Sequence, residues 1–231
     1  AFRVLKDHPV SIGLSPIGES PDRTATPSAP NAETTHQLEP ENKWGLVFRN
    51  KAVWDLALIY FLFGFSYIIY VTFFAKFLQS EAGYSKESAG ALWQLVGWLS
   101  IICGMLWGWV SDVFGRKYAL MAVNILQAVA YLIFALWTTP VGLTLSAVVF
   151  ALTAWSIPAI VASACGDYLG SRLAPAALGL VTLFLGIGQA LGPAIAGKLA
   201  DLSGNFSPAF LLAAVCALLG AYLSMFLSKA H

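Results

Sequence analysis

The stretch GWVSDVFGRK, Gly108 to Lys117, groups Asp112, Arg116 and Lys117 within an apolar region of a chain that has only 11% charged residues. A carboxylate just before a helix can accept hydrogen bonds from backbone amides and complement the positive N-terminus of that helix or of a neighbour. Gly108 permits a bend or close contact where the preceding helix ends, and Gly115 permits a tight reversal. These residues predict electrostatic contacts that hold a turn between helices. An ordinary basic turn on the cytoplasmic side is the simpler alternative.

Aromatic side chains dominate the apolar run 52–78. Tyr60, Tyr67 and Phe74 recur every seven residues, so in a helix they share a face. Tyr67 and Tyr70 lie near the middle of the run, where a hydroxyl needs a hydrogen-bond partner. Taken alone, this pattern favours packing against neighbouring helices or lipid.

Neutral polar side chains interrupt the later apolar runs. Interhelical hydrogen bonding is the default role of an embedded amide, at ~0.6–2 kcal/mol each. The embedded amides are Gln94, Asn124, Gln127 and Gln189. In the run 141–164, Pro158 removes one backbone hydrogen bond, and nearby Ser or Thr side chains can satisfy the freed group. The polar and aromatic residues before this proline are Thr153, Trp155 and Ser156.

Small residues in the run 176–200 predict close helix packing. Gly188 and Gly192 form a GxxxG pair, and Gly179 and Gly186 lie seven residues apart on one face. Such spacing lets two helix backbones approach closely. Pro193 adds a predicted bending point.

The sequence gives no support for an enzyme, a metal-binding protein or a nucleic-acid-binding protein. The histidines lie outside the apolar runs, and no HExxH, P-loop or Gly-x-Ser-x-Gly pattern is present. The cysteines are too far apart for a metal-type pair, so no cofactor is expected. A net charge of +1 gives no pull on nucleic acid. The residues concerned are His8, His36, His231, Cys103, Cys165 and Cys216.

Ionisable groups are absent from the centres of the apolar runs. Asp55 lies about one turn into the first run, where it reaches water, pairs with Arg49 or Lys51, or has a functional role. This part of the protein therefore supplies no deep proton carrier and no cationic anchor for a substrate carboxylate.

Composition and length indicate a membrane protein. Hydrophobic residues make up 58% of the chain, and a spanning helix needs ~20 apolar residues. Six runs meet this requirement, and helices are the only spanning form they fit. The runs are 52–78, 89–110, 118–137, 141–164, 176–200 and 208–227. Residues 1–50 are polar, rich in Pro, Ser and Thr, and predict a largely disordered linker. The fold class is an all-α membrane protein with a six-helix bundle over 51–231.

Basic residues predict the orientation of this bundle, because cytoplasmic loops carry the excess of Lys and Arg. With the N-terminus inside, ten of the thirteen lie on the inner side. Both termini of the segment are therefore expected in the cytoplasm. A polypeptide of this kind has the lipid bilayer as its surroundings, and a bacterial inner membrane is the expected location.

The pattern Gly-x-x-Ser-Asp-x-x-Gly-Arg-Lys between two spanning helices resembles the signature loop of the major facilitator superfamily, with Val113 where a basic residue is usual. The position of this loop implies helices 7 to 12 of a twelve-helix transporter, preceded by the cytoplasmic linker. A second six-helix half would then belong to the same polypeptide. The stretch Leu5 to Glu19 is similar to a linker segment of organic-anion and monocarboxylate-type members.

The resemblance implies roles for these residues. The signature loop would latch the cytoplasmic ends of the two halves and bias the transporter between inward-open and outward-open states. The residues of this latch are Gly108, Asp112, Gly115, Arg116 and Lys117. The first, second, fourth and fifth helices would line a substrate cavity with Tyr60, Tyr67, Tyr70, Gln94, Thr153, Trp155 and Gln189. The expected function is transport of a small organic solute by alternating access, with a lean to organic anions. Drug or metabolite efflux, and a non-transport sensor or assembly protein, are the alternatives.

Overall fold

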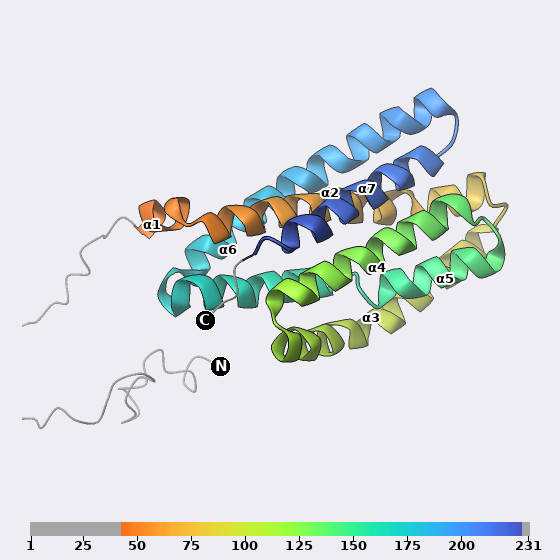
Figure 1. Ribbon diagram of the computed structural model, residues 1–231. Helices are drawn as coiled ribbons and strands as arrows, with labels where there is room; N and C mark the ends of the chain where they lie inside the picture. The colour runs from red at the N-terminus through yellow and green to blue at the C-terminus, as the bar shows by residue number, and fades with distance from the viewer. Residues whose placement is uncertain (1–42, 228–231) are drawn as a thin grey trace, which may run out of the picture. The chain divides into compact units, whose positions relative to one another are not determined.

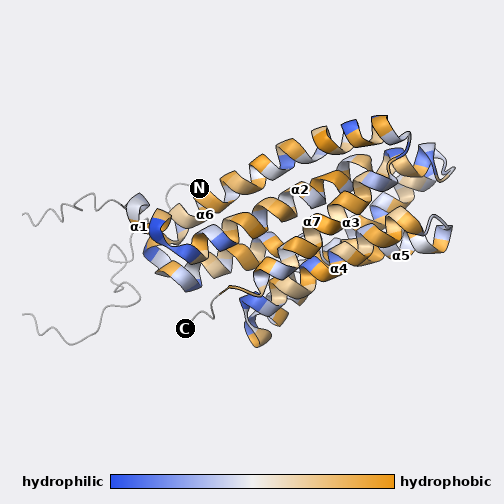
Figure 2. Cartoon of the chain, turned by 45° about the horizontal axis from the view of Figure 1, so that its top comes forward, coloured by the Kyte–Doolittle hydropathy of each residue, from blue (hydrophilic) through white to orange (hydrophobic). Residues whose placement is uncertain are grey.

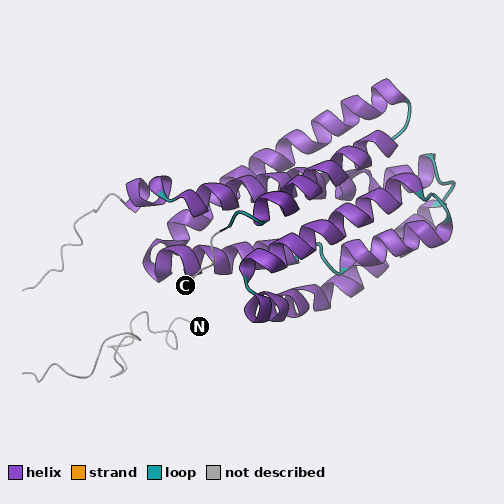
Figure 3. Cartoon of the chain, in the orientation of Figure 1, coloured by secondary structure: helices purple, strands orange, loops and turns teal. Residues whose placement is uncertain are grey.

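The computed structural model describes residues 43–227, which fall within Pro40–His231, one of the two units into which the chain divides. Every regular element in this range is a helix (Figure 3). The helices are α1 (Lys43–Arg49), α2 (Lys51–Ser80), α3 (Lys86–Phe114), α4 (Arg116–Leu136), α5 (Pro140–Ala151), α6 (Ser156–Ser203) and α7 (Ser207–Ser224). Most of the expected linker, residues 1–42, lies outside the described range.

Within residues 43–227, five helical stretches are long and apolar enough to cross a membrane. One of them, Pro140–Ser203, has 64 residues. As a straight helix it would measure ~96 Å, whereas a hydrocarbon core is ~30 Å thick. It is broken between α5 and α6, and α6 reverses direction at Gly170, whose φ is 73° and ψ 167° (Figure 1). This stretch therefore supplies two crossings, and the expected six-span all-α fold is confirmed.

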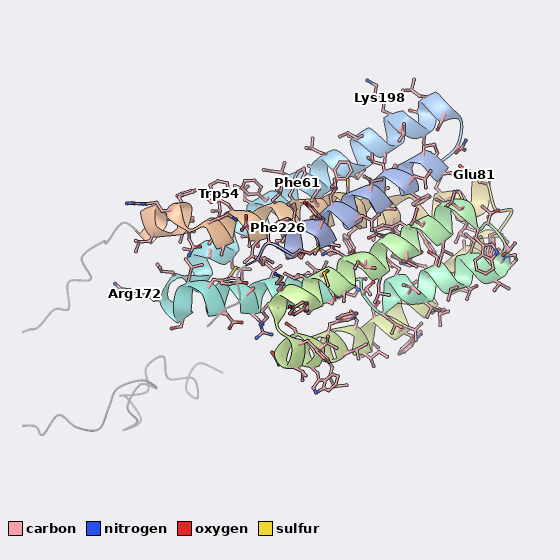
Figure 4. The ribbon with its side chains drawn as sticks, in the orientation of Figure 1. Trp54, Phe61, Glu81, Arg172, Lys198 and Phe226 are labelled. Carbon is pink, nitrogen blue, oxygen red and sulfur yellow. The ribbon has the colours of Figure 1, made fainter. Side chains whose placement is uncertain are left out.

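The helix connections gather at two opposite ends of the bundle. The turns at Gly115 and Gly170 lie at one end, where the Nε of Arg116 is 2.8 Å from a carboxylate oxygen of Asp167. At the other end, the backbone N–H of Phe206 donates to Glu81 at 2.7 Å. Figure 4 shows Trp54 and Arg172 near the first end and Glu81 and Lys198 at the second. Successive spans therefore run antiparallel, as a multi-pass bundle requires.

The centre of the bundle is filled by aromatic rings. Tyr70 of α2 is fully buried, and its ring lies 4.2 Å from that of Phe150 between centroids. The Tyr70 hydroxyl is 2.9 Å from that of Ser146, which in turn donates to the carbonyl of Ala130 at 2.7 Å. The surrounding buried rings are Phe74, Phe77, Tyr131, Phe134 and Phe210. The face of α2 that carries Tyr60, Tyr67 and Phe74 is therefore buried in the bundle along much of its length.

Apolar residues also cover the outside of the bundle. Figure 2 shows orange, apolar residues along the helices and blue, polar residues mainly toward their ends. Helix α3 is the least covered, since 22% of its most apolar window is buried, against 61% for α2. Such a surface is stable only against lipid or another apolar partner.

The GxxxG pair of α6 packs tightly on α2. A Cβ atom added at Gly188 would lie 2.4 Å from the carbonyl oxygen of Phe61, and one at Gly192 would lie 2.7 Å from that of Phe65. Gly64 of α2 meets α6 from the other side, where a Cβ would lie 2.6 Å from the carbonyl oxygen of Leu185. These glycines let the two backbones touch, as their spacing predicts.

Gly179 and Gly186 contact no neighbouring helix among the described residues, so their predicted packing role stays a prediction for the full-length protein. A Cβ atom added at either glycine would have no described atom within 4 Å. Pro193 lies inside α6, whose residue with non-helical backbone angles is Gly170, and its role as a bending point stays a prediction. Gly188 and Gly192 point toward α2, and they lie about 120–180° around the helix from Gly179 and Gly186.

Two predicted boundaries also differ from the structure. Residues 43–49, expected as linker, form α1, because Val47 is fully buried and aromatic contacts hold this turn of helix to α2. The second span continues past Val110 to Phe114. Ser111 is buried inside the bundle, and the backbone first leaves the helical conformation at Gly115, whose φ is positive. The helix therefore ends one turn later than predicted.

Candidate functional site

Arg116 is the centre of a charged cluster where α3, α4 and α6 meet. Its Nη1 donates to Asp112 at 2.6 Å and to the buried hydroxyl of Ser111 at 2.9 Å. Its Nε donates to Asp167 of α6 at 2.8 Å. The Arg116 side chain is only 19% exposed, against 66% for Asp112. One guanidinium therefore ties the last turn of α3 to α6 through charge-assisted hydrogen bonds, which are stronger than neutral ones.

The local backbone explains why this cluster forms. Gly115 has φ 92°, a conformation that residues with a Cβ rarely adopt. It is the single residue between α3 and α4, so it caps the end of one helix and the start of the next. Arg116 follows Asp112 by four residues, and across this reversal its guanidinium faces the Asp112 carboxylate. A cavity of about 420 Å³ adjoins the cluster. Its lining residues are Ser111 to Tyr118, Asp167 and Tyr168.

Two details of the predicted loop are wrong. Gly108 lies inside α3 with open space beside it, rather than at the end of the helix. Asp112 lies in the last turn of α3, and no side chain caps the N-terminus of α4. A carboxylate at a helix C-terminus is disfavoured by the helix dipole, and Arg116 offsets this cost. Lys117 is half-buried beside Arg116 and lines the cavity.

Asp167 was not identified from the sequence, although a signal for it exists. The spacing Asp-x-x-Gly at Asp112–Gly115 recurs at Asp167–Gly170, and both glycines have positive φ. The two turns at this end of the bundle therefore use the same local design, and each contributes one carboxylate to Arg116.

A second site candidate is the break between α5 and α6. Helix α5 supplies 12 residues before it, and α6 runs from Ser156 to its reversal at Gly170 after it. The break at residues 152–155 therefore lies near the middle of the fourth span. Thr153 is buried, and its hydroxyl donates back to the carbonyls of Val149 and Phe150.

Side chains from α3, α4 and the start of α6 satisfy the carbonyls freed by this break. The indole Nε1 of Trp107 donates to the carbonyl of Leu152 at 2.7 Å, and the Ser156 hydroxyl donates to that of Thr153 at 2.6 Å. The amide of Gln127 reaches the same Thr153 carbonyl at 3.4 Å. Broken helices persist in membranes only where such partners exist, so the break is a built feature of the fold.

Trp155 is the exposed side chain of this break. It is 55% exposed, and its ring meets that of Tyr67 edge to face at 5.7 Å between centroids. Tyr67 also stacks on Phe150 at 6.0 Å, while Tyr60 stacks on Phe63. The tyrosines therefore form a buried support, and Trp155 presents the aromatic surface.

The other predicted cavity residues are spread over different surroundings. Tyr70 and Thr153 are buried within this bundle by its own side chains, and their assignment to a cavity wall stays a prediction. Gln94 is exposed on α3, and Gln189 is half-buried on α6. Only Tyr67 and Trp155 are brought into contact among the predicted set.

Replacing Trp107 by phenylalanine tests the support of the break. The variant keeps the ring but leaves the Leu152 carbonyl without its donor, so we expect a loss of about 1–3 kcal/mol in the free energy of unfolding. Thermal unfolding of the full-length protein in detergent measures it. Trp109→Phe, at an exposed indole two residues away, is the control and should leave the unfolding midpoint unchanged. Equal midpoints for both variants would contradict the proposed support.

Metal chemistry gains no support from the described residues. Within 43–227, no group of three or more His, Cys, Asp or Glu side chains is placed to hold a metal ion. Charged side chains meet instead as ion pairs, and Asp55 pairs with Lys51 at 2.6 Å.

The fold and the charged turn define a polytopic helical membrane bundle, and comparison with known proteins specifies its class. A family model described as "Uncharacterised MFS-type transporter YbfB" matches residues 24–225. The chain belongs to this family of the major facilitator superfamily, whose members are transporters and not enzymes.

Curated relatives and solved structures agree with this assignment. The chain is 27% identical over 217 residues to the hexuronate transporter of Bacillus subtilis, covering 85% of the chain and 49% of the relative. It is 30% identical over 137 residues to monocarboxylate transporter 12 of Xenopus laevis, covering 57% of the chain and 30% of the relative.

Two solved structures share the fold. The peptide transporter POT (E310Q mutant, in complex with sulfate) matches with a TM-score of 0.70 at 22% identity, covering 82% of the chain and 43% of that protein. The Escherichia coli fucose:proton symporter FucP (N162A) matches with a TM-score of 0.67 at 18% identity, covering 81% and 45%. Each of these four matches covers more than half of the chain but less than half of the other protein.

Proposed function

We propose that this chain is the C-terminal half of an alternating-access transporter for small organic anions. The observation that carries the proposal is the Arg116 cluster, a compact ion-pair centre that joins three helices at one end of a membrane bundle. Alternating access needs two rigid bundles that rock about a shared site. A bundle held at its end by ion pairs can move as one body.

The exposed carboxylate of Asp112 supports the latch role of the signature loop. The Nε and Nη1 of Arg116 donate within the bundle, while Asp112 remains 66% exposed and can contact a second element. In the proposed full-length protein this element belongs to the N-terminal six-helix half. An exposed anion fits the positive N-terminus of a helix there. Contact in one state and separation in the other would bias the conformational equilibrium.

The substrate class rests on the relatives and on the chemistry of the break. The hexuronate and monocarboxylate transporters are both named for solutes that carry a carboxylate. The break offers an aromatic surface at Trp155 with neutral partners around it. We therefore assign this half the contact with the uncharged part of the solute, and the missing half the contact with the carboxylate.

The proposed orientation follows from the charges at the two ends. In the described residues, Arg49, Lys51, Arg116, Lys117 and Arg172 belong to the end with the Gly115 turn, whereas Lys76, Lys86 and Lys198 belong to the opposite end. Cytoplasmic loops carry the basic excess. We place the Gly115 turn, and with it both ends of the segment, in the cytoplasm of a bacterial cell whose inner membrane holds the bundle.

Uptake by the full-length protein in proteoliposomes tests the substrate class. Radiolabelled glucuronate, a short monocarboxylate and a neutral sugar are compared at equal concentration, with protein-free vesicles as the control. Saturable uptake of either acid, and none of the sugar, supports the proposal. Uptake of the sugar alone would overturn the assignment to organic anions. Expulsion of a lipophilic cation would favour drug efflux, which the exposed indole also suits.

Truncating Trp155 tests its contact with the solute. We expect Trp155→Ala to raise KM by about tenfold, since a stacked aromatic contact and its buried area contribute about 1–2 kcal/mol. Trp155→Phe should retain most of the affinity, because it keeps an aromatic face. The matched control is Trp98→Ala, an exposed tryptophan on α3. An unchanged KM in Trp155→Ala would show that Trp155 does not contact the solute.

A further inference from the structure

A cluster of four aromatic rings joins α1, α2 and α6 at the end of the bundle that holds Arg172. Centroid distances are 6.0 Å from Trp44 to Phe48, 6.2 Å from Phe48 to Trp54 and 5.7 Å from Trp54 to Phe184. Three of the side chains stay open on their outer side: Trp44 is 51% exposed, Phe48 47% and Trp54 41%. We call these four residues the aromatic platform.

The platform is fixed to the bundle. Val47 of α1 is fully buried, and the indole Nε1 of Trp54 donates to the carbonyl of Phe48 at 2.8 Å. Asn50, between the two helices, accepts the N–H of Ala52 at 2.9 Å and so caps α2. Because the indole of Trp54 already has a partner, its exposed ring presents apolar surface and needs no further acceptor.

Basic side chains border the platform. Arg49 ends α1 and is exposed, and the side chain of Lys51 is 80% exposed although its Nζ contacts Asp55. On a helical wheel, Val47 faces the bundle while Arg49 points away from it. Tryptophan favours the zone between lipid tails and water, and nearby Lys and Arg attract anionic headgroups.

We propose that the aromatic platform is a lipid-interface anchor that binds anionic phospholipid headgroups through Arg49 and Lys51. Its position is continuous with α2, which begins at Lys51 and is long and apolar enough to cross a membrane. The inserted rings hold α1 at the membrane surface and so fix where the chain enters the bundle. This role is independent of the transported solute and of the latch.

Quenching of tryptophan fluorescence tests the anchor in the full-length protein. The protein is placed in nanodiscs whose phosphatidylcholine or phosphatidylglycerol carries bromine near the headgroup end of the acyl chain. The difference between wild type and Trp44→Phe isolates the signal of Trp44, and Trp54→Phe does so for Trp54. We expect both signals to be quenched by the brominated lipids, and more strongly by phosphatidylglycerol.

A charge variant tests the headgroup contact. Arg49→Gln should reduce the preference of the Trp44 signal for phosphatidylglycerol by about fivefold, whereas Lys198→Gln, at the opposite end, should not change it. Quenching of Trp44 by aqueous iodide instead of lipid would overturn the proposal, because the platform would face water. Shielding from both quenchers would overturn it too, and would show that another protein segment covers the rings. An unchanged lipid preference in Arg49→Gln would overturn the proposed binding of anionic headgroups.

Discussion

Replacing Arg116 by glutamine is expected to slow transport by the full-length protein at least about tenfold, because Arg116 neutralises two carboxylates from different helices. The variant leaves Asp112 and Asp167 without their shared cation and removes the hydrogen bond to Ser111. Initial rates of solute uptake in proteoliposomes measure the effect. Expression and the unfolding midpoint are recorded alongside, so that loss of protein is separated from loss of function.

Removing each carboxylate separates the two functions of the cluster. Asp167→Asn breaks the internal tie to α6, so we expect lower stability together with slower transport. Asp112→Asn should leave the more exposed position structurally intact but reduce transport by loss of the latch. The comparison variant is Lys117→Gln, at another residue of the signature loop, which removes a positive charge and keeps the Arg116 contacts. If Lys117→Gln slowed uptake as much as Arg116→Gln, net positive charge rather than the ion-pair geometry would govern the rate.

The number and type of spans followed from the sequence because hydropathy acts over twenty residues at a time. The lipid-facing and core-facing sides of each span are both apolar, so the runs stand out without knowledge of contacts. The helix ends were less predictable. Ser111 is polar but buried, and the final turn of α3 is fixed by Gly115 and Arg116 rather than by a change in hydropathy.

The sites were predictable only in part, because long-range contacts decide them. The signature loop was found from local spacing, whereas Asp167 lies 51 positions from Arg116 along the chain. Tyr70 and Tyr67 are both mid-span tyrosines of α2, yet Tyr70 is enclosed by rings from three other helices while Tyr67 reaches Trp155. Hydropathy does not distinguish them, since the choice depends on how α4, α5 and α7 pack around α2.

Substituting alanine at Gly188 is expected to destabilise this bundle. The added Cβ would lie 2.4 Å from the carbonyl oxygen of Phe61 and 2.9 Å from the backbone nitrogen of Phe65. Both neighbours are backbone atoms of a spanning helix, so no side chain can rotate away. The helices must separate, and we expect a loss of about 1–3 kcal/mol. Thermal unfolding of the full-length protein in detergent is the measurement.

Gly186→Ala is the matched control, because it adds the same methyl group to the same helix. No described atom lies within 4 Å of its added Cβ, and alanine has the higher helix propensity, by about 1 kcal/mol. Its unfolding midpoint should therefore equal or exceed that of the wild type. A loss in Gly188→Ala alone would show that the α2–α6 contact limits stability. Equal losses in both variants would place a partner against the Gly186 face in the full-length protein, since of these two glycines only Gly188 meets a described atom.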